Sequence, residues 1–110
     1  EFMDKPAIEV CEAFAKAGYP LDVEALLIIE VEGSPEEISM LLGRIVQIVE
    51  PIGPSVIRVS ESAEQSAAIW RGRKSAFGAI GRLADYYCMD GTIPLGQLAG
   101  VVERKVAMQR

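Results

Sequence analysis

The chain has 110 residues, half of them apolar and a quarter charged, with a formal net charge of -5 and no histidine. This length suits one small domain, and the acidic balance argues against nucleic acid as a partner. Without histidine the chain cannot hold a Ser-His-Asp triad, and a metal site is not expected because histidine is the commonest metal ligand. Cys11 and Cys88 lie far apart and are expected to be free thiols.

The N-terminal segment predicts a helix followed by a strand. Residues 1–3 resemble a cloning remnant, so the domain is expected to comprise residues 4–110. Residues 5–18 predict a helix that stops at Gly18 and has one apolar face. That face comprises Ile8, Cys11, Phe14 and Ala15. Residues 22–32 are continuously apolar at their centre, which predicts a strand buried within a sheet.

The next segment contains the clearest helix. Ser34 is a good N-cap, Pro35 suits the first helical position, and Glu37 completes a capping box. An apolar stripe then follows at helical spacing until Pro51 ends the helix. The stripe comprises Ile38, Leu41, Leu42, Ile45, Val46 and Val49. Residues 55–60 predict a short strand.

The C-terminal half continues the alternation of helices and strands. Ser62 and Gln65 offer a second capping box at the start of a helix that extends to about Ala84. Residues 86–94 predict a strand, and residues 96–109 predict a last helix with a weak apolar face. The expected fold class is therefore α+β, a ferredoxin-like α/β sandwich with an antiparallel sheet and helices packed on one face.

The predicted helix over 62–84 carries a basic stretch in this acidic chain, IWRGRKSAFGAIGR at 69–82. On a helical wheel, Arg71 and Arg82 fall on the solvent side and Lys74 falls at an edge. Arg73 instead falls in the middle of the apolar arc. That arc comprises Ile69, Trp70, Ala76, Phe77, Ile80, Leu83 and Ala84.

Arg73 therefore needs a partner, because an unpaired buried charge is strongly unfavourable. The pattern leaves open an internal salt bridge to Asp90 or Asp85, a side chain that reaches out of a thin core, and a clamp on an anionic ligand. Trp70 fits either the core or a pocket wall. Three glycines of this helix follow no strand, so they are expected to allow close packing and not to bind phosphate. They are Gly72, Gly78 and Gly81.

The string IWRGRKSAFGAIGRLADYYCMDGTIP at 69–94 closely resembles the C-terminal domain of FAD-linked oxidases, a family that includes D subunits of bacterial glycolate oxidase and D-lactate dehydrogenases. AGYPLDVEALLIIEVEG at 17–33 is similar to the family's first strand region. The resemblance implies oxidation of a 2-hydroxy acid, of the glycolate or D-lactate class, to a 2-oxo acid. FAD is the implied cofactor of the full-length enzyme.

The family's glycine-rich FAD loop and its histidine-containing segment are absent from this chain. The chain is therefore expected to be a substrate-side fragment, inactive alone and binding neither FAD nor a metal. The implied partners are the 2-hydroxy-acid substrate, the FAD-binding domain of the same parent chain and other oxidase subunits, and exposed surface predicts a homo-oligomer. A cytoplasmic location, with membrane association through partner subunits, is expected because no signal peptide or spanning apolar run is recognisable.

The resemblance also assigns roles to residues. The arginine of the family's Trp-x-x-Arg string contacts the substrate carboxylate, and its position here is Arg73. The same resemblance implies that Trp70, Phe77, Asp90 and Thr92 line the active site, and no catalytic residue is expected within this chain. Leu95 stands where relatives commonly have arginine, which puts a second cationic contact in doubt.

A second hypothesis fits the pattern of helices and strands equally well. The chain would then be a stand-alone ferredoxin-like module that binds a small ligand or forms oligomers without catalysis. An RNA-binding sheet of similar topology is excluded by the negative charge and by the lack of aromatic residues in the predicted strands.

Overall fold

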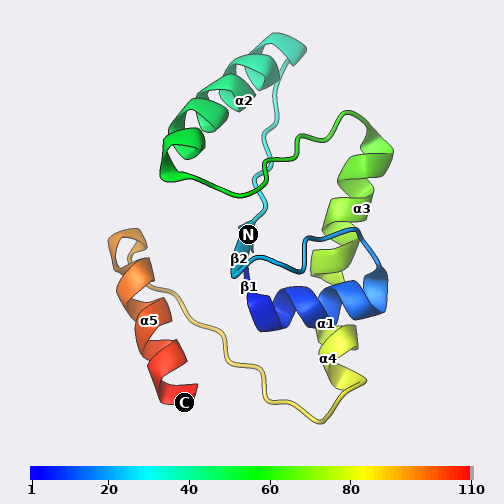
Figure 1. Cartoon of the computed structure of the whole chain (residues 1–110), viewed down its shortest axis with the longest axis vertical. Coiled ribbons are helices and arrows are strands. Elements are labelled where there is room, and N and C mark those ends of the chain that lie inside the picture. The colour runs from blue at the N-terminus through cyan, green and yellow to red at the C-terminus, as the bar shows by residue number, and fades with distance from the viewer. Residues whose placement is uncertain (110) are drawn as a thin grey trace.

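The computed structural model describes residues 1–109. Its elements are β1 (Phe2–Asp4), α1 (Lys5–Ala15), β2 (Ala25–Leu27), α2 (Pro35–Val49), η1 (Glu50–Ile52), α3 (Ala63–Lys74), α4 (Ala76–Gly81), η2 (Leu95–Gln97) and α5 (Leu98–Gln109), where η marks a 3₁₀ helix. β1 and β2 pair beside α1, which packs against α3 and α4 (Figure 1). In the same view α2 and α5 stand away from this cluster.

The fold class is α+β, but the sheet is smaller than predicted. Within residues 1–109 it consists of the antiparallel pair of β1 and β2, in which Met3 lies opposite Leu26. The strand predicted over 22–32 is limited to β2. The strand predictions for 55–60 and 86–94 are wrong, because neither segment has a backbone partner to form a ladder. The ferredoxin-like arrangement stays a prediction.

Residues 1–3 belong to the fold, although the sequence led us to exclude them. Glu1 and Ile28 extend the β1–β2 ladder by two backbone hydrogen bonds of 2.9 and 2.8 Å. Met3 is buried in a small core together with Ile8, Cys11 and Tyr19. Composition does not show what the backbone pairs with, and the origin of residues 1–3 as a cloning remnant stays a prediction.

α1 begins as predicted and ends earlier. Asp4 caps it, with Oδ1 accepting a hydrogen bond of 3.2 Å from the Ala7 amide. The helix ends at Ala15 and not at Gly18, because Lys16 already has a left-handed backbone with φ of 49°. Of the predicted apolar face, Ile8 and Cys11 are buried, Ala15 is half-buried and Phe14 is exposed.

α2 forms as the sequence predicts. Ser34 Oγ accepts from the Glu37 amide at 3.2 Å, and Glu37 Oε2 accepts from the Ser34 amide at 2.7 Å, which completes the capping box. All six residues of the predicted apolar stripe are half-buried. All of them except Leu41 line an apolar groove of about 690 Å³, together with residues 25–31, residues 54–60 and the Ile69–Trp70 part of α3.

The helix predicted over 62–84 is interrupted at Ser75. Its N-cap is Ser62, whose Oγ accepts from the Gln65 amide at 3.1 Å, but Gln65 Oε1 accepts from the Glu61 amide, so the second capping box is half made. At the break, Ser75 Oγ donates to the Arg71 carbonyl at 2.6 Å. A serine side chain that bonds back to a helix carbonyl is a known cause of helix bending.

The buried face of α3 and α4 is not the predicted arc of large apolar residues. The residues that face α1 are small: Gly72 and Ala79 are buried, and Ala76 packs against the core. Phe77 and Leu83 are exposed by 55% and 71%. The burial prediction for these two is wrong. Helices that approach closely need small residues at the contact, whereas a helical wheel identifies only the apolar face.

The remaining prediction, a helix over 96–109, is confirmed by η2 and α5 together. The segment between α4 and η2 is irregular and exposed. Among the helices described, none is both long enough and apolar enough to cross a membrane.

Candidate functional site

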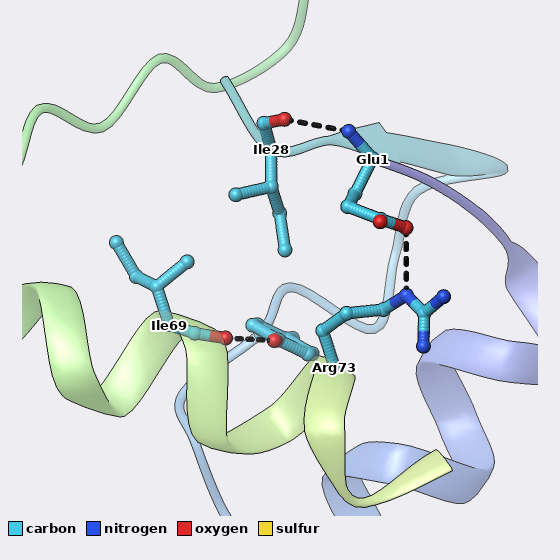
Figure 2. A network of polar contacts seen from close by, with 5 residues as sticks. Glu1, Ile28, Ile69 and Arg73 are labelled. Atoms are coloured by element: carbon cyan, nitrogen blue, oxygen red, sulfur yellow. Dashed lines mark hydrogen bonds and ion pairs between the residues drawn. The ribbon is translucent and has the colours of Figure 1, made fainter. Parts of the chain in front are cut away.

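Arg73 lies in the last turn of α3, with one third of its side chain exposed. Its Nε donates a hydrogen bond of 2.8 Å to Glu1 Oε2, at the end of the β1–β2 ladder (Figure 2). The expectation that Arg73 has a carboxylate partner is confirmed. The partners suggested by the sequence, Asp90 and Asp85, are wrong, because both lie in the exposed segment after α4.

The Arg73 guanidinium uses only one of its three nitrogens as a hydrogen-bond donor within the described part of the chain. Within the described part of the chain, Nε carries the hydrogen bond to Glu1 and the two Nη atoms carry none. The hydrogen bond, and then the charge of Arg73, hold the pKa of the Glu1 carboxyl below its ordinary value. The planar fork of arginine matches a carboxylate bidentately, so Arg73 retains donors for a carboxylate ligand.

Tyr19 contacts the turn of α3 that leads to Arg73. Its side chain is buried, and its hydroxyl donates to the Ile69 carbonyl, one of the groups drawn in Figure 2. Its ring lies on the backbone of Gly72, where an added Cβ would overlap the ring and the hydroxyl. Burial raises the pKa of the Tyr19 phenol. The close packing predicted for Gly72 is therefore confirmed, with Tyr19 as the neighbour.

Two side chains hold the turn that carries Tyr19. The Glu12 carboxylate accepts hydrogen bonds from the amides of Gly18 and Tyr19 at 3.0 and 2.9 Å. Arg58 Nη1 donates to the Gly18 carbonyl. Sequence reasoning missed Glu12 and Tyr19, and the one signal that pointed toward them was a glycine at position 72 inside a helix.

The other predicted site residues are not gathered around Arg73. Trp70 shares α3 with Arg73 and lines the apolar groove. Phe77 lies in α4 with its ring centroid 6.2 Å from that of Tyr86. Asp90 and Thr92 are exposed in the irregular segment, and no hydrogen bond or ion pair links them to another residue of the described chain.

Arg82 and Cys11 are two further groups that could take part in binding or chemistry. The Arg82 guanidinium lies 4.8 Å from the centre of the Phe14 ring, so this cation stacks on an aromatic face and is not solely solvated. Cys11 is a buried thiol whose pKa is raised by burial. No group of three histidine, cysteine, aspartate or glutamate side chains suited to a metal ion occurs among the described residues.

The N-termini of α2 and α3 do not fit the diphosphate of FAD. A diphosphate binds at an uncapped helix N-terminus after a glycine-rich turn, where free amides and the helix dipole face it. Here the side chains of Ser34 and Glu37 occupy the amides at the start of α2, and Glu36 adds negative charge. Ser62 caps α3, with Glu64 in its first turn. The starts of these two helices therefore offer no free amides for the diphosphate of FAD.

The sequence pattern of the FAD linked oxidases, C-terminal domain, matches residues 1–109. The chain belongs to this family. The resemblance carried by the 69–94 string is thereby confirmed, and the family consists of oxidoreductases that use FAD.

The chain is similar to a subunit of glycolate oxidase from two bacteria. The glycolate oxidase subunit GlcD of Escherichia coli strain K12 is 41% identical over 104 residues, which cover 94% of this chain and 21% of that protein. The glycolate oxidase subunit GlcD of Bacillus subtilis strain 168 is 30% identical over 104 residues, or 94% of this chain and 22% of the relative. The chain thus spans about a fifth of the length of these relatives. No solved structure matches the chain.

Proposed function

We propose that this chain is the substrate-side part of a flavin-dependent oxidoreductase that oxidises a 2-hydroxy acid, of the glycolate or D-lactate class, to a 2-oxo acid. Family membership supports the redox class, and the names of the relatives support glycolate. The observation that carries the proposal is Arg73, a helix-borne guanidinium that holds a carboxylate at 2.8 Å and keeps two nitrogens for another.

Arg73 binds and orients the substrate in this proposal. The substrate carboxylate replaces that of Glu1 on the guanidinium, which stays charged at any physiological pH. Fixing the carboxylate fixes the adjacent carbon and its hydroxyl, so that the reaction proceeds from one geometry. FAD supplies the oxidising chemistry and is bound by another domain of the parent chain.

The remaining assignments follow from the same proposal. Trp70, Phe77, Asp90 and Thr92 line the site once the FAD-binding domain and other oxidase subunits are in place. This chain contributes no general base, and on its own it is inactive. The parent enzyme is cytoplasmic, with membrane association through its partner subunits.

The test is the substitution Arg73→Lys in the parent-length flavoenzyme, with glycolate and D-lactate as substrates. Lysine keeps the charge and removes the fork, so KM for the active substrate should rise about ten- to hundredfold, as expected for loss of a hydrogen bond between charged groups. Arg71→Lys, an exposed arginine in the same helical turn, is the control and should leave KM unchanged. An unchanged KM in Arg73→Lys would overturn the proposal.

A further inference from the structure

We propose that Tyr19 is a positioning residue for substrate binding: it fixes the turn of α3 that carries Arg73, so that the guanidinium is aimed at the substrate carboxylate. This inference rests on the proposed function of Arg73. It assigns to Tyr19 a role that acts through Arg73, by way of a bonding partner 50 residues away in the sequence.

The first support is the atom to which the Tyr19 hydroxyl donates. It is the carbonyl oxygen of Ile69. In an α-helix the carbonyl of residue i accepts from the amide of residue i+4, so this carbonyl also faces the amide of Arg73. Tyr19 therefore joins the peptide hydrogen bond that sets the backbone direction of Arg73.

The second support is the contact with Gly72, the residue before Arg73. The Tyr19 ring occupies the space that any side chain at position 72 would need. The ring and the hydroxyl together contact both the start and the end of a single helical turn. A shift of this turn would move the Arg73 Cα and, through a long side chain, the guanidinium by a larger amount.

The third support is that Tyr19 is anchored independently of α3. The Glu12 carboxylate from α1 holds the Tyr19 amide at 2.9 Å and the neighbouring Gly18 amide at 3.0 Å. Arg58, in the segment between α2 and α3, donates a hydrogen bond to the Gly18 carbonyl. Because two segments outside α3 fix the turn, the buried Tyr19 side chain can act as a fixed point against which α3 is placed.

The experiment is a double-mutant cycle of Tyr19→Phe and Arg73→Lys in the parent-length flavoenzyme, measured with the better of glycolate and D-lactate. Tyr19→Phe keeps the ring and removes one hydrogen bond. It should raise KM about two- to tenfold, the range for one hydrogen bond, with kcat changed by less than about twofold. In the Arg73→Lys background the same substitution should change KM by less than about twofold, because the group being positioned is already lost.

The remaining outcomes show which of the two proposals fails, the function of Arg73 or the positioning role of Tyr19. If Arg73→Lys leaves KM unchanged, the proposed function fails. If Arg73→Lys raises KM, two results overturn the positioning role alone: an unchanged KM in Tyr19→Phe, or an equal rise in both backgrounds, which a merely structural role would give. Rates are normalised to bound flavin, and Gly72→Ala, which displaces the same ring, provides a second variant with the same expected KM effect.

Discussion

At the scale of single residues, Arg73 and Glu1 form a pair that links the two ends of the folded core. The two side chains are 33% and 43% exposed, so solvent screens the pair and its contribution to the free energy of unfolding is small, below about 1 kcal/mol. The pair is therefore better detected by titration than by stability. A weak pair also suits the exchange of one carboxylate for another that we propose at Arg73.

Replacing Arg73 by methionine should raise the pKa of the Glu1 carboxyl toward its ordinary value of 4.5, because both the hydrogen bond and the positive charge are lost. The carboxyl carbon shift of Glu1, followed by NMR through a pH titration, measures this. Arg71→Met should leave the pKa in place. Since the folded pKa is depressed, the stabilisation is complete above the unfolded pKa and disappears as pH falls through the folded pKa. An identical Glu1 titration in both variants would contradict the pairing.

The sequence identified Arg73 from helical phase but could not identify its partner. Phase is a local property and places a residue on one face of a helix. Glu1 is 72 residues away, and its approach depends on a ladder with Ile28 that no local pattern encodes. Tyr19 was missed for the same reason, since its bond to Ile69 spans 50 residues.

At the scale of elements, the close contact between the turn after α1 and the last turn of α3 depends on Gly72. Gly72→Ala should destabilise the chain by about 1–3 kcal/mol, the usual effect of overpacking, because the new Cβ overlaps the Tyr19 ring. Gly78→Ala is the matched control: its Cβ would lie 3.7 Å from Phe14, an ordinary contact. Alanine is the better helix former, so Gly78→Ala should be neutral or stabilising.

Urea unfolding followed by circular dichroism measures both glycine variants. Equal unfolding midpoints for Gly72→Ala and Gly78→Ala would show that the Tyr19 ring does not pack on α3 as described. A lower midpoint for Gly72→Ala alone supports the contact.

Helices were more predictable from the sequence than strands, since one of the three predicted strands formed, and only as the short β2. The starts of α2 and α3 were correct because Ser34 and Ser62 act on amides within three residues. The strands expected at 55–60 and 86–94 failed because a strand requires a partner that periodicity does not supply. The break at Ser75 was also missed, since serine inside a helix bends it only when its hydroxyl turns back to the chain.

At the scale of the whole molecule, the chain is open. Its radius of gyration is 15.6 Å, whereas a compact domain of this length has about 13 Å. Its accessible surface is 8866 Å², whereas a folded monomer of this mass exposes about 6,000 Å². Much of the excess is apolar and lies along the groove beside α2 and along the segment after α4.

The isolated chain should therefore self-associate, because burial of this apolar surface is favourable. Sedimentation velocity should show a weight-average mass that rises with protein concentration above that of the 11.9 kDa monomer. The dye ANS should fluoresce strongly with the dilute protein. A monomer at all concentrations that leaves the dye dark would contradict the open shape.

The contacts that join residues 1–28 to residues 69–81 also determine how the middle of the chain relates to the core. Residues 29–62, including α2, form one long loop between two fixed points. Before the loop, Ile28 bonds to Glu1, and after it, Ile69 bonds to Tyr19. The entropy of closing such a loop grows only with the logarithm of its length, about 0.6 kcal/mol for each doubling. The loop can therefore be lengthened, shortened or replaced in evolution at little cost in stability. The short segments whose hydrogen bonds hold its ends together have no such freedom.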